Sequence, residues 1–390
     1  MERQLETFIL HLKRKNVVGS YQVSRATAEL LRHWVSKEKW SNAKTLIEAI
    51  RAIGKRLIDA QPLEFCIGNI VRRVLFIIRE EYLAIKKNTE LESATSSTTS
   101  KSPSSSASSS TTTSPTPASP QTTAVHNLSS STSATSQLRS ETSSKHLLSY
   151  EDNEDIDFTE NFPRLKAAII DSVNELIDEL EGLHRNVADQ AIEHIHSNET
   201  IMTLGCSKTV EEFLKEAARK RSFKVIVVET SPSLEGQKTA LTLSKASIDT
   251  TLITDSAVFA MMSRVNKVII GTHAVMANGG LIATSGTHLL AVAAKYHSVP
   301  IVVCTGLYKL CPLYAYDQDT FNNFGSPGEY LKFEEAEYLE HVHSYNPTFD
   351  YITPDLISLF ITNIGGHNPD YLYRLIQEYY DPRDSLEDDQ

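Results

Sequence analysis

Hydrophobic residues recur at helical spacing through the first 90 residues, and this pattern predicts four helices. In ERQLETFILHL (2–12) the apolar positions recur every three or four residues, as on one face of a helix. The segment SNAKTLIEAIRAIGKRLIDAQP (41–62) has a helix start signal at Ser41 and a stop at Pro62. The apolar side of residues 67–87 is most simply a face that packs against another helix.

A stretch rich in serine, threonine and proline, residues 93–150, interrupts this pattern. Such a composition cannot bury enough apolar surface to offset its ordering entropy, so we expect a disordered insertion. Helical spacing resumes in 151–198, which makes 1–92 and 151–198 the two parts of one helical N-terminal domain. Four hydroxyl residues precede prolines and are candidate phosphorylation sites, the alternative being a solvated linker without a regulatory role: Ser102, Ser114, Thr116 and Ser119.

From residue 199 to 390, short β-branched runs alternate with helical segments. The runs are apolar almost throughout, which is typical of strands in a parallel sheet that helices cover on both faces. The expected fold class is therefore α/β, with the helical domain followed by a Rossmann-like, doubly wound, mainly parallel sheet domain. The predicted strands are TIMTLG (200–205), KVIVVET (224–230), TTLITD (250–255), KVIIGT (267–272) and PIVVC (300–304).

The charge and the motifs exclude several classes of protein. A net charge of −11 argues against a direct nucleic-acid partner, which normally meets a basic surface. The four cysteines form no C-x-x-C pair, and the His-x-His pairs at 194–196 and 341–343 do not supply the ligands of a metal site. Neither a P-loop nor G-x-G-x-x-G follows the first strand. We therefore expect no metal and no cofactor.

No apolar run reaches the roughly 18 residues of a membrane span, so we expect no membrane association and a cytosolic protein. The basic run 215–224 either engages an acidic or phosphorylated partner or is simply the C-terminus of a helix, where cations complement the helix dipole. The acidic end, DPRDSLEDDQ (381–390), is expected to be a frayed tail.

A candidate pocket follows from the stretch VIIGTHAVMANGGLIATSGTH (268–288), which starts as a strand, continues as a glycine-containing loop and ends at a helix start. This arrangement often makes a phosphate or sugar site. In open α/β sheets the ligand lies beyond the carboxyl ends of the strands. The residues expected there, or in the adjoining loop, are Cys206, Ser231, Asp255, His273 and Asn278.

The blocks ETSPSLEGQKTAL, TLITDSAV, VIIGTHAVMANGG and NPTFDYITPDLI resemble, in order and spacing, the isomerases of methylthioribose 1-phosphate and ribose 1,5-bisphosphate. The same order occurs in the regulatory subunits of eukaryotic translation initiation factor 2B. Blocks such as AIEHIHSNET and KTVEEFLKEAARKR extend the second resemblance over nearly the whole chain, to the beta branch rather than the alpha or delta branch.

The chain departs from the isomerase pattern where their chemistry resides. His273 stands where the isomerases have their proton-moving aspartate, and Ser231 where they have a phosphate-binding arginine. Their asparagine and lysine become Ala283 and Thr284, and the segment with their catalytic cysteine is absent. The resemblance therefore implies a vestigial pocket and no enzyme activity, with a structural role for His273. Two alternatives stay open: an active sugar-phosphate isomerase with His273 as base, and an inactive sensor of a sugar phosphate.

The second resemblance implies a regulatory subunit of the guanine nucleotide exchange factor for initiation factor 2. The expected partners are the alpha, gamma, delta and epsilon subunits of the same factor, with delta the closest, in a hetero-decamer holding two copies of each subunit. The expected substrate contact is with the alpha subunit of initiation factor 2, whose phosphorylation the complex senses. An acquired phosphate changes the charge of that contact by about −1.5 to −2.

Overall fold

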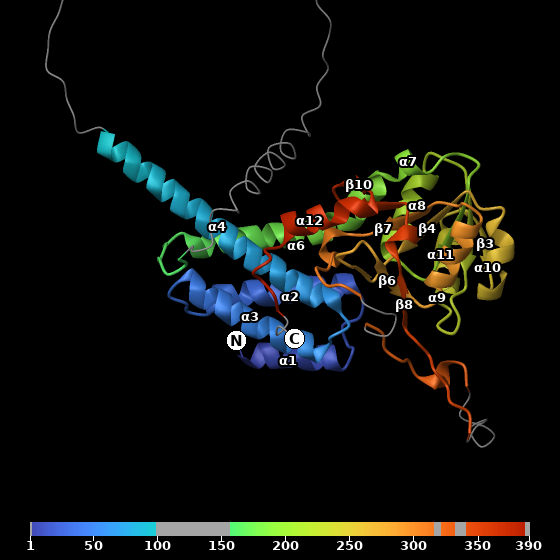
Figure 1. Ribbon diagram of the computed structural model, residues 1–390, viewed down its shortest axis with the longest axis horizontal. Coiled ribbons are helices and arrows are strands. Elements are labelled where there is room, and N and C mark those ends of the chain that lie inside the picture. Colours follow the sequence, from blue (N-terminus) through green and yellow to red (C-terminus); the bar gives the residue numbers. More distant parts are fainter. Residues whose placement is uncertain (1, 99–156, 316–320, 332–340, 387–390) are drawn as a thin grey trace, which may run out of the picture. The chain divides into compact units, whose positions relative to one another are not determined.

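The computed structural model describes residues 2–98, 157–315, 321–331 and 341–386 (Figure 1). The chain divides into two compact units, Met1–Glu81 with Asn161–Gln390, and Tyr82–Glu160. In the second unit the Tyr82 hydroxyl donates to the carbonyl of Asp157 at 2.7 Å, and its ring packs against Phe158 at 4.9 Å between centroids. The candidate phosphorylation sites lie outside the described residues: Ser102, Ser114, Thr116 and Ser119.

The four predicted N-terminal helices are confirmed: α1 (Glu2–Lys13), α2 (Ser20–Lys37), α3 (Ala43–Ala60) and α4 (Phe65–Thr98). The start signal of α3 was misplaced by one residue, because the side chain of Asn42, not Ser41, accepts the hydrogen bond of a first-turn amide, that of Thr45. Helix α4 continues six residues past the predicted boundary at 92, into the first residues of the Ser/Thr-rich stretch.

A fifth long helix, α6 (Leu165–Asp189), is followed by the single turn α7 (Ala191–His194). Its buried residues recur every three or four positions, from Leu165 and Ile169 to Leu183 and Val187. Helix α6 packs on α2 and also on the sheet-covering helix α8 (Lys208–Ala218). We call α1–α4 as far as residue 81, with α6 and α7, the helical part, and β1 to α12 the α/β part.

The main sheet has the strand order β10-β9-β7-β4-β1-β2-β3. Six strands are parallel, and only β10 at the edge is antiparallel to its neighbour. Counted along the chain, the parallel strands follow the 3-2-1-4-5-6 order of a Rossmann fold, which confirms the predicted fold class. The strands are β1 (Thr200–Leu204), β2 (Lys224–Val228), β3 (Asp249–Ile253), β4 (Lys267–Gly271), β7 (Ile301–Cys304), β9 (Leu359–Thr362) and β10 (Gly365–His367).

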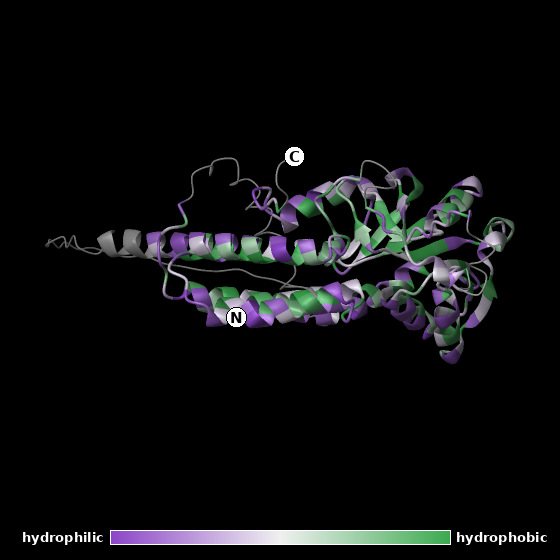
Figure 2. Ribbon diagram, turned by 90° about the horizontal axis from the view of Figure 1, so that it is seen from below, coloured by the Kyte–Doolittle hydropathy of each residue, from purple (hydrophilic) through white to green (hydrophobic). Residues whose placement is uncertain are grey.

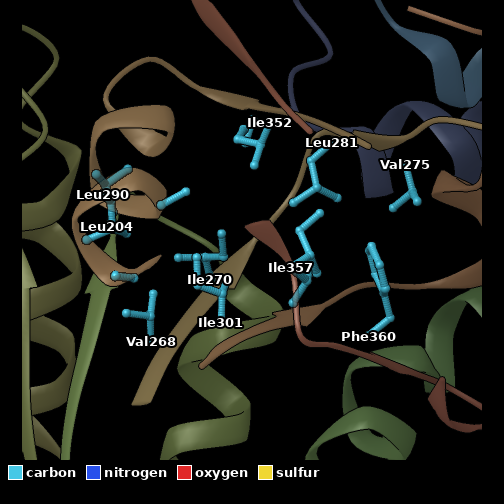
Figure 3. Packing of buried hydrophobic residues seen from close by; sticks show 14 of the residues in the cluster. Leu204, Val268, Ile270, Val275, Leu281, Leu290, Ile301, Ile352, Ile357 and Phe360 are labelled. Carbon is cyan, nitrogen blue, oxygen red and sulfur yellow. The ribbon is translucent and has the colours of Figure 1, made fainter. Parts of the chain in front are cut away.

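Both faces of the central strands β1, β2, β4 and β7 are buried, which explains why these strands are largely apolar, whereas the edge strands β3 and β10 are partly exposed. On one face, alternate residues such as Val268 and Ile270 pack with Leu290 and the residues around it (Figure 3). Helices α10 (Val258–Met262), α11 (Thr287–Tyr296) and α12 (Leu372–Tyr379) supply that side of the core. Helices α8 and α9 (Glu235–Lys245) make the preceding crossovers. Figure 2 shows hydrophobic strands and helices with one hydrophilic side.

The stretch that was predicted to be a glycine loop is largely a β-hairpin. Strands β5 (Ala274–Val275) and β6 (Leu281–Thr284) pair antiparallel, and β8 (Phe349–Ile352) adds a third strand. The turn contains Gly279 at φ +81°, a conformation that favours glycine. The pairing of Leu281 with Ile352 joins segments 71 positions apart, so local periodicity did not reveal this small sheet.

Candidate functional site

The carboxyl ends of β1 and β4 meet where the strand order reverses, the usual ligand position of a doubly wound sheet. Gly205 and Cys206 follow β1, and Thr272 and His273 follow β4. The structure therefore places two of the five predicted pocket residues, Cys206 and His273, at this switch point.

Ser231 and Asp255 come together on the same edge of the sheet. The backbone N–H of Ser231 donates to Oδ2 of Asp255 at 2.7 Å. The N–H of Gly205 donates to the hydroxyl of buried Thr230 at 2.9 Å, which joins the ends of β1 and β2. The Asp255 carboxylate thus occupies the amide of Ser231, a donor that would otherwise be available to an anion at this edge.

The exposed Cys206 lacks the surroundings of a reactive thiol. Its Sγ lies 3.8 Å from Oε1 of Glu211, and partial burial raises the pKa of Cys206 above its ordinary value. Burial also raises the pKa of Glu211, although Lys215 partly opposes this shift. A nucleophilic cysteine needs a lowered pKa and a neighbouring cation. The thiol therefore stays protonated at neutral pH.

His273 points toward the helical part and is engaged at both ring nitrogens. Its Nε2 lies 2.8 Å from the carbonyl of Leu63, and its Nδ1 lies 3.4 Å from the hydroxyl of Ser20 on α2. The ring stacks on Phe349 at 4.6 Å and an interplanar angle of 24°, and Phe65 meets it edge-on. A carbonyl can only accept, so Nε2 carries the proton and Nδ1 accepts from Ser20.

These contacts make His273 a connection between the two parts of the chain. An isomerase base must present a nitrogen to the substrate, whereas both nitrogens of His273 face protein groups 253 and 210 positions away in the sequence. The imidazole joins the β-hairpin, α2 and the start of α4 in one contact. Its geometry is that of a structural residue.

Three ionisable groups that the sequence did not reveal lie beside His273. Oε1 of Glu64, a buried residue, is 3.9 Å from Nε2 of His273 and accepts from the Cys66 thiol at 3.2 Å. Nζ of Lys309 donates to the carbonyl of Thr272 at 2.6 Å. Burial raises the pKa of Cys66 and lowers that of Lys309, and the latter effect is opposed by Cys66 and Glu64. The sequence hinted at one of these groups alone, since Lys309 comes shortly after the buried strand β7.

The same junction contains buried polar atoms with unmet hydrogen-bonding capacity. Ser24 Oγ, Thr27 Oγ1 and Asn69 Oδ1 have no hydrogen-bond partner among the residues that the structure describes. His184 binds the hydroxyl of Thr209 at 3.0 Å through Nδ1. Burial, with help from Lys208 and Lys309, lowers its pKa from 6.5 to about 4, so it is neutral at pH 7. Buried polar atoms of this kind are usually satisfied by water or a polar ligand.

Asn278 does not belong to this group, because its side chain holds the hairpin turn. Its Nδ2 donates to the Tyr351 hydroxyl at 2.7 Å, and its Oδ1 accepts from the N–H of Gly280 at 2.9 Å. The helix start that follows is already occupied. Oδ2 of Asp350 accepts from the N–H of Gly286 at 2.8 Å and of His288 at 3.0 Å, where a helix N-terminus would otherwise attract a phosphate.

No group of three or more His, Cys, Asp or Glu side chains is placed to hold a metal ion within the described ranges. Of the helices built from described residues, none is long and apolar enough to cross a membrane.

Comparison with known proteins gives a consistent result. A model of the initiation factor 2 subunit family matches residues 16–369. The chain is 77% identical over 387 residues to translation initiation factor eIF2B subunit beta of Dictyostelium discoideum, a match that covers 98% of this chain and 97% of the relative. This confirms the predicted resemblance to the beta branch.

Two solved structures are similar throughout their length. The crystal structure of eIF2B beta from Chaetomium thermophilum superposes with a TM-score of 0.67 at 28% identity, covering 98% of this chain and 94% of that one. A chain of the tetrameric eIF2B-beta2-delta2 complex from C. thermophilum gives 0.64 at 26% identity, with coverage of 97% and 95%. The helical domain and the α/β domain are thus shared with these proteins.

Proposed function

Because the chain belongs to the initiation factor 2 subunit family, we propose that it is a non-catalytic, beta-type regulatory subunit of the guanine nucleotide exchange factor for translation initiation factor 2. The observation that carries this proposal is the 77% identity along nearly the full length of both chains. At that identity most of the surface is shared as well as the core, so the contacts that assemble a complex are expected to be shared too. We place the protein in the cytosol.

The proposed partners are the alpha, gamma, delta and epsilon subunits, two copies each in a hetero-decamer with delta closest. The similarity to a chain of the eIF2B-beta2-delta2 tetramer supports the delta contact. Affinity purification of the protein from its own cells, followed by native mass spectrometry, tests the assembly. Recovery with four different partners at two copies each supports it, whereas recovery as a lone homo-oligomer overturns it.

The absence of isomerase activity is part of the proposal. Both nitrogens of His273 are bound to protein groups, and Asp350 occupies the α11 N-terminus. Ser231 supplies no cation to clamp a phosphate, which an aldose-ketose isomerisation needs in order to fix its geometry. Turnover of a pentose 1-phosphate by the purified protein would overturn this part of the proposal.

The proposed regulatory role is to hold the alpha subunit of initiation factor 2 and to help distinguish its phosphorylated form. Charge supports the N-terminal helices as the contact, because residues 2–90 carry 17 Lys and Arg against 10 Asp and Glu, a net charge of +7 in a chain of net −11. A phosphate adds about −1.5 to −2 charges and strengthens contact with a basic surface. A response in a distant subunit then requires different affinities for two arrangements of the complex.

Charge reversal at the end of α1 tests this role. Lys13, Arg14 and Lys15 are exposed, and changing all three to Glu in the reconstituted complex should weaken inhibition by the phosphorylated factor while exchange on the unphosphorylated factor continues. Exposed Lys238, Lys245 and Arg264 of the α/β part lie outside the basic run 215–224 and, all three changed to Glu, are the matched control. If the α1 variant leaves both binding and inhibition intact, the role belongs to a neighbouring subunit.

A second candidate function, an inactive sensor of a sugar phosphate, is favoured by one observation. The buried ammonium of Lys309 follows Tyr308, whose carbonyl accepts from Nδ2 of Asn69, and Oδ1 of that buried Asn69 has no hydrogen-bond partner among the described residues. A thermal-shift screen with pentose phosphates tests it, since a ligand that binds the native state must raise its melting temperature. No shift at millimolar concentrations would leave the junction as a purely structural contact.

A further inference from the structure

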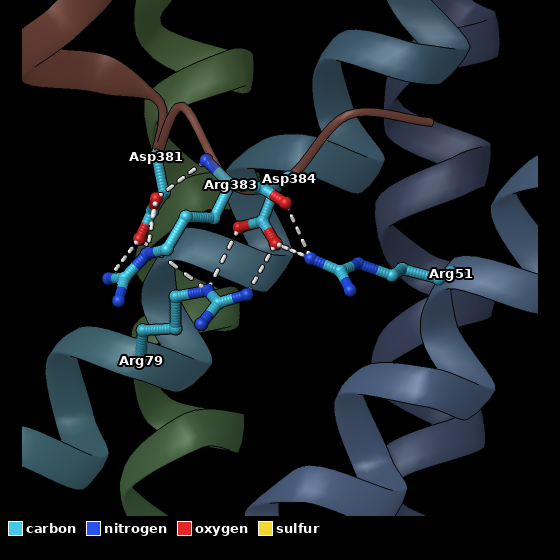
Figure 4. Close-up of polar contacts among 5 residues, drawn as sticks. All are labelled: Arg51, Arg79, Asp381, Arg383 and Asp384. Atoms are coloured by element: carbon cyan, nitrogen blue, oxygen red, sulfur yellow. Dashed lines mark hydrogen bonds and ion pairs between the residues drawn. The ribbon is translucent and has the colours of Figure 1, made fainter. Parts of the chain in front are cut away.

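The last residue of α12 and the segment after it, residues 379–386, return to the helical part, where five of these eight residues are buried (Figure 4). Its described residues beyond α12 lie outside helices and strands, yet the side chains of Asp381 and Asp384 are 0% exposed. Leu386 is also buried. The prediction of a frayed tail from residue 381 is therefore wrong, although residues 387–390 lie outside the described chain.

Asp384 pairs with two arginines of the helical part. Its Oδ1 accepts from Arg79 on α4 at 2.8 Å and from Arg51 on α3 at 2.9 Å, and its Oδ2 accepts from Nε of Arg79 at 3.2 Å. Arg51 also donates to the carbonyl of Arg383 at 2.6 Å. The side chain of Arg79 is only 7% exposed, so this pair has lost nearly all of its water.

Asp381 extends the network. It accepts from Nε and an NH2 group of Arg383 at 3.0 and 2.8 Å, and lies 3.5 Å from Nε of Arg79. Burial raises the pKa of Asp381, but its hydrogen bonds with Arg383 and its attraction to Arg79 outweigh burial, so the net shift is downward. The carboxylate therefore stays charged well below neutral pH.

The N-terminal end of the segment is held at the C-terminal end of α12. The carbonyl of Tyr379 accepts from Arg73 at 3.2 Å, and the guanidinium of Arg73 lies 4.2 Å from the centre of the Tyr379 ring. The Tyr380 hydroxyl donates to the carbonyl of Leu310 at 2.8 Å. One short segment thus contacts α3, α4 and the loop after β7.

We propose that residues 379–386 form a C-terminal latch, which ties the helical part to the α/β part and opens as a unit. Removing one member of a buried ion pair leaves the other charge desolvated. The closed latch is therefore strongly favoured over any state in which only some of these ion pairs are broken. Movement of the helical part relative to the sheet within one subunit then requires release of Asp384 from both Arg51 and Arg79. The latch does not depend on the function proposed above.

Hydrogen exchange of the full chain, read by mass spectrometry, tests the latch. Asp384→Asn keeps the shape of the side chain and removes its charge, and Asp370→Asn, the same change at an exposed position just before α12, is the matched control. We expect Asp384→Asn to accelerate amide exchange at least about tenfold in residues 379–386 and in the facing segments 43–60 and 65–81. Exchange in β1, β4 and β7 should stay at the wild-type rate, and Asp370→Asn should match wild type throughout.

Two results would overturn the latch. Exchange in 43–60 and 65–81 that is unaffected by Asp384→Asn would show that the helical part is held by other contacts. Equal acceleration in the sheet would show general destabilisation instead of opening at one place. Should Asp384→Asn fail to fold, Arg51→Gln tests the latch instead. The side chain of Arg51 is 34% exposed, and its loss leaves the ion pair between Arg79 and Asp384 intact. Faster exchange in the same segments then supports the latch, and wild-type exchange rejects it.

Discussion

Replacing His273 by Ala distinguishes a structural histidine from a catalytic one. The substitution removes the hydrogen bond to Leu63 at 2.8 Å, the weaker one to Ser20 and the stacking on Phe349. A lost hydrogen bond that leaves a carbonyl unsatisfied costs about 1–3 kcal/mol, and an aromatic pair contributes about 0.5–1.5 kcal/mol. We therefore expect His273→Ala to lower the free energy of unfolding by about 2–4 kcal/mol.

Urea unfolding followed by circular dichroism and by tryptophan fluorescence measures this loss. Both tryptophans, Trp34 and Trp40, lie in the helical part, so their fluorescence reports the part that His273 holds. Cys206→Ser is the control, because this exposed thiol lies 3.8 Å from Glu211 and a hydroxyl of similar size replaces it, so its change should stay within about 0.5 kcal/mol.

Two results together would contradict a structural role for His273. If His273→Ala unfolds within about 0.5 kcal/mol of wild type, the contacts to Leu63 and Ser20 contribute little. If it also abolishes turnover of a pentose 1-phosphate that the wild type converts, His273 is a catalytic base. Loss of stability in a protein that was never active supports the structural role.

Three further measurements test other parts of the structure. Asn42→Ala should cost about 1 kcal/mol in unfolding free energy through loss of the α3 cap, while Ser41→Ala should cost almost nothing; equal effects would contradict the assignment of the cap. Gly236→Ala should strongly lower the melting temperature, since a Cβ there would lie 1.9 Å from the carbonyl oxygen of Val228. A Cβ at Gly182 on α6 would meet Nδ2 of Asn186 at an ordinary 3.7 Å, so Gly182→Ala should stabilise by up to about 1 kcal/mol; a harmless Gly236→Ala would show that the backbone shifts freely. Because the pKa of His184 is lowered in the folded chain, the unfolded chain binds the proton first, and the free energy of unfolding should fall as pH drops from 6.5 to about 4. His184→Gln should make this fall smaller; a variant with the same pH profile as wild type would show that His184 does not cause it.

Five of the seven strands of the main sheet were predicted because their signal is local, whereas β9 and β10 were not predicted. Each central strand is a short apolar run bounded by polar residues, and the parallel arrangement follows from the alternation with helices. The small sheet was not predicted because β5 has only two residues, and because its neighbour β6 pairs with β8, a strand 71 positions further along the chain. Strand β10 is a Gly-Gly-His segment with no β-branched residue.

The structure has Cys206, Ser231 and Asp255 at strand ends along one edge of the sheet, where the rule for strand ends places them. That they line a vestigial ligand pocket stays a prediction. The rule did not reveal that His273 faces Leu63, or that Asp350 caps α11, because these contacts join residues 210 and 64 positions apart. The acidic C-terminal segment was misread for the same reason, since charge alone does not show that Arg79 lies opposite Asp384.

The separation of Arg79 and Asp384 along the chain also sets an order of events during synthesis. The two residues are 305 positions apart, and at roughly 5–20 residues per second a ribosome needs about 15–60 s to pass from one to the other. Throughout that interval the nascent helices exist without the carboxylates that neutralise Arg51 and Arg79. A chain cut short before residue 381 keeps these guanidiniums but never acquires their partners. Premature termination close to the C-terminus should therefore yield a product that cellular proteases remove faster than the complete chain.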